Sequence, residues 1–219
     1  MFKNNLSLVI ILLIFGISCK KNNISTIYTK NNIDTLFEQP KNLYFDGDNI
    51  IDTVKIRSKS VEKVQNFELL LHLSTLGQII EIPIINNSIL YNNNYSVYYV
   101  SDPIISDENI QIRIDYADQV TKLNISGEKK NLIEKIKYRF DVKNRKIQII
   151  GYELSYNKNK NSNYKKSFNF ITGKYYSSSD VNGIKKDGSG WSMELENIYI
   201  KTWDSKFLSK LLMYGNEVE

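Results

Sequence analysis

The chain has 219 residues, of which 42% are hydrophobic and 24% are charged, and its formal net charge is +5 at pH 7. The apolar content excludes global disorder, and the mild charge does not point to a nucleic-acid partner, so we expect none. The single cysteine, Cys19, argues against a disulfide framework. One alanine stands beside 31 isoleucines and 26 asparagines, a bias typical of an AT-rich genome. The many isoleucines and tyrosines favour strands over helices.

The first 19 residues have the features of an export signal. Lys3 is followed by an apolar run of 12 residues, Leu6 to Ile17, which suits the core of a signal peptide and is too short to cross a bilayer as a helix. The run ends in Gly16-Ile17-Ser18-Cys19. These four residues resemble the lipobox of bacterial lipoproteins, with Gly16 where leucine is common. The resemblance implies a lipoprotein signal peptide over residues 1–18 and lipid, such as palmitate, on Cys19.

A lipid on Cys19 implies a protein anchored to a membrane of the bacterial cell envelope. Buried acyl chains stabilise membrane association by about 0.8 kcal/mol per CH₂, so several chains make it effectively permanent. Position 20 is lysine instead of the aspartate that retains lipoproteins at the inner membrane, and Lys20-Lys21-Asn22-Asn23 lacks the acidic residues of surface export. We therefore expect the periplasmic face of an outer membrane. The polar residues 19–35 predict a tether, followed by a domain over 36–219.

The segment Phe45 to Asp52 has the spacing of an ion-binding loop. Oxygen ligands at alternating positions are typical of Ca²⁺ sites, and here they would come from Asp46, Asp48, the carbonyl of Ile50, and Asp52. The segment is similar to the Asp-x-Asp-Gly-Asp-Gly-x-x-Asp loop of integrin-type and related exported repeat proteins. Tyr44 stands at the first aspartate of that pattern, which removes one carboxylate. The preferred interpretation is a metal-free turn, because Asp and Gly favour tight loops regardless of metal; calcium is the alternative and the only cofactor that we consider.

The remaining domain is dominated by period-two alternation of apolar residues. Phe67 to Leu73, Ile110 to Tyr116 and Ile136 to Val142 each place apolar side chains on one face and polar ones on the other. This pattern favours antiparallel sheets, in which one face stays wet. We predict a mainly β domain, arranged as a sandwich, a barrel or a meander.

Turn residues separate these predicted strands. Lys143-Asn144-Arg145 predicts a hairpin turn before a strand from Lys146 to Leu154, and Asn92-Asn93-Asn94 precedes a strand over Tyr95 to Val100. Lys186 to Gly190 predicts a loop, followed by a strand in which Trp191, Met193 and Leu195 share a face.

The stretches Ile147 to Glu153 and Ser167 to Lys174 resemble a segment of uncharacterised exported envelope proteins of Gram-negative bacteria, a group with no activity to carry over. Gly151 suggests a bulge or a close approach, and Asn169 suggests a side chain that caps a turn. Between the two stretches, Tyr156 to Lys166 has four lysines and no acidic residue. It is either a basic finger for a phosphate-bearing lipid or acidic protein, or a mobile hairpin tip.

One helix is predicted near the C-terminus. Asp204 or Ser205 can cap its start, and Gly215 can end it. Between them one helical face is apolar, which predicts packing on the sheet; its residues are Phe207, Leu208, Leu211 and Leu212.

Catalytic signatures are weak. His72 is the only histidine and is expected to be half-exposed on a strand, and no nucleophile elbow or phosphate loop appears. Several tyrosines could line a surface for a glycan or protein partner, or belong to the core and sheet faces: Tyr95, Tyr98, Tyr99, Tyr175 and Tyr176. We expect a non-catalytic binding or structural module of the envelope; the alternatives are an immunity-type lipoprotein that neutralises a toxin, and an envelope hydrolase.

Overall fold

The structure, a computed structural model, describes residues 36–38, 43–61, 64–85, 95–106, 108–118, 132–159 and 161–215. All of them belong to one compact unit, Ile33–Glu219. Several predicted features lie outside the described residues. They are the signal peptide with its flanking residues Gly16, Ile17 and Ser18, the expected lipid attachment at Cys19, the expected tether, and Asn92-Asn93-Asn94. No helix of the described part is long and apolar enough to span a bilayer.

The larger of two sheets has eight strands in the order β12-β11-β10-β9-β8-β7-β5, with β6 beside β7. Every pairing in it is antiparallel, and β7 to β12 follow one another as a meander. The strands are β5 (Tyr95–Val100), β6 (Ile104–Ser106), β7 (Asn109–Asp118), β8 (Leu132–Asp141), β9 (Lys146–Asn159), β10 (Ser162–Asn169), β11 (Lys174–Val181) and β12 (Ile184–Trp191).

The smaller sheet has four antiparallel strands in sequence order. They are β1 (Leu36–Glu38), β2 (Thr53–Val61), β3 (Val64–Leu73) and β4 (Gln78–Ile84). After β12 come two short 3₁₀ helices, η2 (Met193–Leu195) and η3 (Ile200–Thr202), and the α-helix α2 (Ser205–Leu212). The predicted fold class, mainly β with antiparallel sheets and a C-terminal helix, is confirmed.

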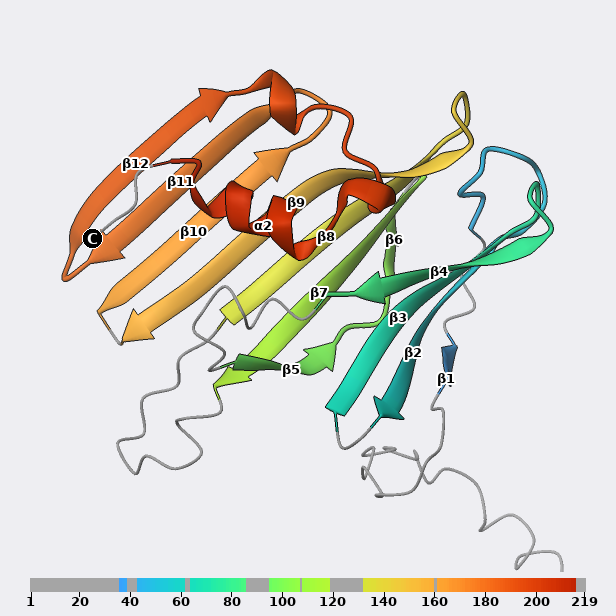
Figure 1. The fold of residues 1–219 in the computed structure, drawn as a ribbon, viewed down its shortest axis with the longest axis horizontal. Coiled ribbons are helices and arrows are strands. Elements are labelled where there is room, and N and C mark those ends of the chain that lie inside the picture. Colours follow the sequence, from blue (N-terminus) through green and yellow to red (C-terminus); the bar gives the residue numbers. More distant parts are fainter. Residues whose placement is uncertain are drawn as a thin grey trace, which may run out of the picture. The chain divides into compact units, whose positions relative to one another are not determined.

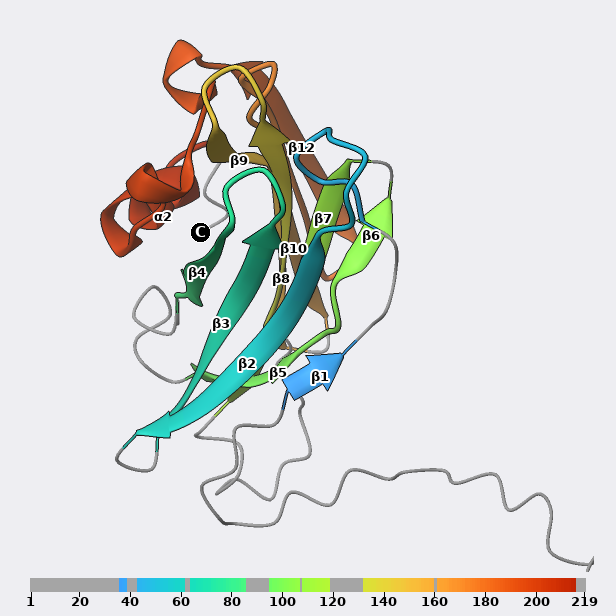
Figure 2. The same cartoon turned by 90° about the vertical axis from the view of Figure 1, so that its right-hand side faces the viewer.

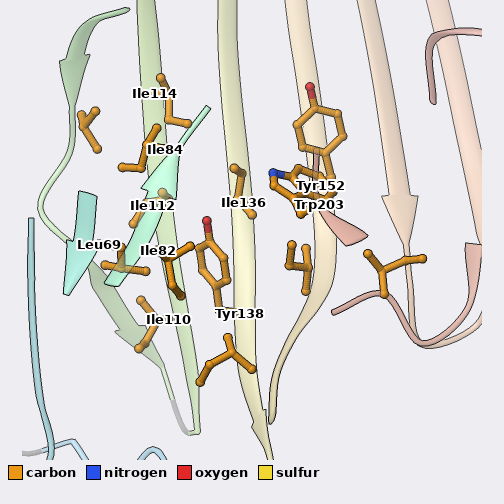
Figure 3. Close-up of a cluster of buried hydrophobic side chains, with 14 of the residues drawn as sticks. Leu69, Ile82, Ile84, Ile110, Ile112, Ile114, Ile136, Tyr138, Tyr152 and Trp203 are labelled. Carbon is orange, nitrogen blue, oxygen red and sulfur yellow. The ribbon is translucent and has the colours of Figure 1, made fainter. Parts of the chain in front are cut away.

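One face of the larger sheet carries the core. The smaller sheet and α2 both lie on that face (Figures 1 and 2). Over β7 and β8, apolar side chains of the two sheets meet (Figure 3); they are Leu69, Ile82, Ile84, Ile110, Ile112, Ile114 and Ile136. The alternation predicted for β3, β7 and β8 is confirmed, because their apolar faces are buried. The other face of the larger sheet is covered by neither the smaller sheet nor α2.

A carboxylate is buried in this core. Glu134 of β8 has no exposed surface, and its two oxygens accept hydrogen bonds from the hydroxyls of Tyr116 at 2.8 Å and Tyr152 at 2.7 Å. Tyr138, four residues further along β8 on the same face, is buried as well, and burial together with the Glu134 charge raises the pKa of the Tyr138 phenol. These bonds offset part of the desolvation of the Glu134 side chain.

Helix α2 begins as predicted. The Asp204 side chain caps it by accepting a 2.7 Å hydrogen bond from the Phe207 N–H. Leu208 and Leu211 are buried, and the ring centroid of Phe207 lies 6.1 Å from that of Phe170, directly after β10. The predicted packing of the helix on the sheet is confirmed. The helix ends at Leu212, and Gly215 follows with a left-handed φ of 85°.

The prediction for residues 186–196 is wrong. Lys186 to Gly190 lie within β12 instead of forming a loop, and Met193 to Leu195 form η2 instead of a strand. Gly190 is needed for packing, not for a turn, because a Cβ there would lie 2.4 Å from the Tyr175 hydroxyl oxygen. The reversal occurs earlier, at Asn182 and Gly183, whose φ angles of 53° and 81° suit a two-residue hairpin.

The predicted turn after β8, the bulge at Gly151 and the cap at Asn169 are confirmed, but the strand before the turn ends one residue earlier than predicted. The turn after β8 includes Lys143 to Arg145, but Val142 lies outside the strand and is exposed. The register between β8 and β9 shifts next to Gly151, as expected for a bulge. The Asn169 side chain caps the next turn by accepting from the N–H groups of Ile171 at 3.0 Å and Thr172 at 3.1 Å.

Candidate functional site

The predicted ion loop is held in place by its three aspartates. Asp52 is fully buried; one of its oxygens accepts from the N–H groups of Phe45 at 2.7 Å and Asp46 at 3.1 Å, and the other accepts from the Ser74 N–H at 2.7 Å. The Asp52 N–H donates to the Leu43 carbonyl at 2.7 Å, which closes the loop at its base. Asp52 thereby ties the entry of β2 to the turn between β3 and β4.

Asp46 and Asp48 face the same turn. Asp46 accepts from the Thr75 N–H at 2.9 Å, and Asp48 accepts from the Thr75 hydroxyl at 3.0 Å. The Ser74 hydroxyl lies 2.7 Å from an Asp48 oxygen and 3.2 Å from an Asp46 oxygen. Burial opposes ionisation of Asp46, but the hydrogen bonds from Thr75, the Asp48 N–H and Ser74 outweigh it and lower the pKa of Asp46.

The hydrogen bonds of the three aspartates act as a structural clamp that holds the loop against the turn at Ser74 and Thr75. The oxygens of Asp46 and Asp48 already accept hydrogen bonds, and Ile50 is an exposed residue whose N–H donates to Asp48 at 2.8 Å. No group of three or more His, Cys, Asp or Glu side chains in the described ranges is arranged to hold a metal ion. Calcium at Asp46, Asp48, Ile50 and Asp52 stays the alternative prediction.

The predicted tyrosine surface is divided among separate places. Tyr98 and Tyr99 are exposed on β5, near one edge of the larger sheet, whereas β11 lies near the other edge. Tyr175 packs in the core, with its ring 5.2 Å from that of Tyr214. Tyr176, its neighbour, points to the opposite face and is exposed. The side chain of Tyr95 is outside the described part.

The lysines of the predicted basic finger also separate. Lys166 points to the helix side, where its ammonium group donates to the carbonyl oxygens of Leu212 and, at 3.0 Å, Tyr214. A cation at this position stabilises the C-terminal end of α2. Lys165 points to the other face of the sheet. The side chains of Lys158 and Lys160 are outside the described part.

A polar groove lies on that other face, across β9 to β12. Its volume is about 470 Å³. Alternate residues of four neighbouring strands line it: Ser155, Asn157, Asn163, Lys165, Tyr176, Ser178, Asp180, Lys185 and Asp187, with Tyr164 and Ser179 completing the lining. Register explains the gathering, because Lys165 pairs with both Ser155 and Ser178, and Ser178 pairs with Asp187. The groove therefore presents amides, hydroxyls, two lysines and two carboxylates to solvent.

Two exposed aromatic rings belong to the same face. The Tyr176 hydroxyl donates a 2.8 Å hydrogen bond to Asp187, and the Trp191 indole N–H donates a 3.1 Å hydrogen bond to Glu196. The bond to Asp187 raises the pKa of the Tyr176 phenol, so this hydroxyl stays protonated and remains a donor at neutral pH. Each ring is thus tethered at its polar atom to a carboxylate.

Sequence reasoning found Tyr176 and Lys165 but missed the rest of the groove. The usable signal was the polar alternation of β10 and β11, in which Asn163, Lys165 and Ser167 share one face with Ser178 and Asp180 of the next strand. The contribution of β12 was hidden, because Gly188 and Gly190 predict a loop. His72 lies elsewhere: it is exposed on β3 in the smaller sheet, opposite Thr53 and Ile79.

Comparison of the chain with models of known protein families, with characterised proteins and with solved structures finds no match. The function of the groove and of the aspartate loop is therefore inferred from their own geometry.

Proposed function

We propose that the protein is an exported lipoprotein of the bacterial cell envelope that binds a ligand without transforming it, and that the groove across β9 to β12 is its binding surface. The observation that carries the binding proposal is the groove itself, an open volume of about 470 Å³ on a sheet face that neither the smaller sheet nor α2 covers. Gly16-Ile17-Ser18-Cys19 carries the anchoring proposal.

The chemistry of the groove suits binding better than catalysis. Lys165, Lys185 and Asp187 are exposed to water, which screens their charges. Acid–base catalysis relies on groups that burial and neighbouring charges have tuned, whereas exposed polar groups supply hydrogen bonds to a ligand. A lipid anchor on a tether then places this surface beside a membrane.

The anchor is tested by labelling the protein in cells with a palmitate analogue. Wild-type protein is expected to incorporate the label and to sediment with membranes, because the Cys19 thiol carries the lipid. Cys19→Ala removes the thiol and is expected to abolish both. Ser18→Ala keeps a small residue before the cysteine and is the matched control. Equal membrane fractionation of the wild type and Cys19→Ala would refute the anchor.

The binding surface is tested by sedimenting purified protein with isolated envelopes. The probe is the processed chain, residues 19–219 with Cys19→Ser, which contains the whole compact unit. Lys165→Glu changes the floor of the groove, whereas Lys143→Glu makes the same charge change in the exposed turn after β8. We expect Lys165→Glu to reduce the bound fraction at least fivefold and Lys143→Glu to leave it unchanged. Equal retention of both variants would refute the groove as the binding surface.

A further inference from the structure

Two exposed aromatic residues, Tyr176 and Trp191, lie on the same sheet face at the end of the groove that Tyr176 lines. Tyr176 of β11 pairs with Ser189 of β12, and Trp191 lies two residues further along β12, on the same face. Such diagonal neighbours are about 7–8 Å apart at Cα. The exposed fractions of the two side chains, 42% for Tyr176 and 56% for Trp191, leave a large part of each ring open to solvent. We call these two residues the aromatic platform: Tyr176 lines the polar groove, and Trp191 lies one diagonal step beyond it.

The orientation of both rings is set before any ligand arrives. The 2.8 Å bond from Tyr176 to Asp187 and the 3.1 Å bond from Trp191 to Glu196 restrict side-chain rotation. A restrained side chain loses less conformational entropy on binding, and this favours affinity. Exposed aromatic rings with a polar tip are also the side chains most enriched at binding surfaces.

The charge of the groove selects against strongly charged ligands. Lys165 and Lys185 face Asp180 and Asp187, two cations against two anions. Phosphate-rich ligands are bound where positive charge is concentrated, and that condition is not met here. The amides of Asn157 and Asn163 and the hydroxyls of Ser155 and Ser178 each offer both a donor and an acceptor.

We infer that this surface binds a neutral oligosaccharide of pyranose rings, which stack on Tyr176 and Trp191 and extend along the groove. This inference rests on the proposed function. A pyranose ring has an apolar face of C–H groups and an edge of hydroxyls that donate and accept at once. The aromatic platform matches the face, and the asparagines, serines and aspartates of the groove match the edge.

The test is calorimetric titration of the processed chain, residues 19–219 with Cys19→Ser, with four-ring oligomers. The probes are β-1,4-linked N-acetylglucosamine, β-1,4-linked glucose and α-1,4-linked glucose. At least one oligomer is expected to bind saturably, and its monosaccharide at least tenfold more weakly, because a single ring cannot cover both aromatics. Trp191→Ala and Tyr176→Ala are each expected to weaken binding at least tenfold.

The control is Tyr98→Ala, which removes a more exposed tyrosine from β5; its affinity is expected to equal that of the wild type. Tyr176→Phe keeps the ring but loses the bond to Asp187, and it is expected to retain more affinity than Tyr176→Ala. The thermal midpoints of all variants show whether they are folded.

The inference is overturned if none of the three oligomers binds at about 10 mM, a concentration that detects even dissociation constants in the millimolar range. It is also overturned if a folded Trp191→Ala binds as the wild type does. If Lys165→Glu still reduces binding to envelopes while no oligomer binds, the saccharide is wrong and the binding surface stands. If Lys165→Glu does not reduce binding to envelopes and no oligomer binds, the proposed binding surface is refuted as well.

Discussion

The buried carboxylate of Asp52 accepts a 2.7 Å hydrogen bond from the backbone N–H of Ser74, 22 residues further along the chain. Together with the N–H groups of Phe45 and Asp46, three backbone donors converge on this one side chain. Folding removes these three N–H groups from water, and the Asp52 carboxylate takes the place of water as their hydrogen-bond acceptor. It therefore joins two loops that local sequence alone does not connect.

Removing this carboxylate is expected to destabilise the protein. Asp52→Ala leaves three backbone N–H groups without their acceptor, which is expected to lower the free energy of unfolding by about 3 kcal/mol. Asp52→Asn keeps one acceptor oxygen and is expected to cost about half as much. Urea denaturation measures both. The exposed Asn49 is a suitable control, with Asn49→Ala expected to change the free energy by less than about 0.5 kcal/mol. Wild-type stability in Asp52→Ala would contradict the clamp.

Stability is expected to fall in acid because of Asp141. Hydrogen bonds from the Asn144 side chain and from the Tyr199 hydroxyl lower the pKa of Asp141 from 3.8 to about 2. A carboxyl whose pKa is lower in the folded state stabilises that state above its unfolded pKa, and the contribution is lost as the pH falls through the folded pKa. The free energy of unfolding should therefore decrease between pH 4 and pH 2. Asp46, whose pKa is also lowered, adds to the decrease.

The Asp141 contribution can be isolated with Tyr199→Phe, which deletes the 2.7 Å bond from the Tyr199 hydroxyl to Asp141. In this variant the Asp141 carboxyl is expected to titrate closer to 3.8, as followed by carbon-13 NMR. Tyr98→Phe, in which an exposed tyrosine distant in sequence is changed, should leave the Asp141 titration as it is. An unchanged midpoint in Tyr199→Phe would show that this hydroxyl does not set the pKa.

Two glycines with similar backbone angles should respond differently to a methyl group. Gly173 and Gly183 have φ angles of 63° and 81°. A Cβ on Gly183 meets nothing within 4 Å, whereas a Cβ on Gly173 would lie 2.5 Å from the Ser192 carbonyl oxygen. Gly183→Ala is expected to lower the free energy of unfolding by about 1 kcal/mol, which is the cost of holding an alanine in the left-handed backbone conformation. Gly173→Ala should cost about 1–3 kcal/mol more, as overpacking does. Equal melting temperatures would contradict the close approach.

Calcium titration distinguishes the two interpretations of the aspartate loop. Because the Ser74 and Thr75 hydroxyls already donate to Asp48, an ion would have to displace them. We expect the hydrogen-bonded loop to persist and calorimetry with millimolar Ca²⁺ to show no binding heat. A saturable heat that disappears in Asp48→Ala would instead establish the calcium loop.

The fold class was predictable because burial on one face imposes a period of two on the residues. Ile110 to Tyr116 and Phe67 to Leu73 show that period, and both became strands with a buried face. The helix was predictable for a similar reason, since the capping oxygen of Asp204 and the apolar positions after it are local features. The prediction failed at β12, because Gly188 and Gly190 look like loop residues, and the packing of Tyr175 against Gly190 is a tertiary contact.

The candidate site was only partly predictable. Tyr176 was recognised as a residue for a binding surface, but it was grouped with Tyr175, which packs in the core, and with tyrosines of β5 near the far edge of the sheet. Side chains from four strands line the groove, and their meeting depends on register, which is a property of strand pairs. No single stretch of the chain contains it.

The sequence by itself determined the strand-rich character, the capped helix and the expectation of an export signal with a lipid-bearing Cys19, since each depends on residues close together in the chain. Only the tertiary structure decided that Asp52 accepts a hydrogen bond from Ser74, and that Lys166 contacts the end of α2 whereas Lys165 lines the groove. It also decided that Trp191 lies on the same sheet face as Tyr176, as its diagonal neighbour. These relationships arise when the strands pair and one sheet face is covered, because pairing brings distant residues together and covering selects which face remains open to a ligand.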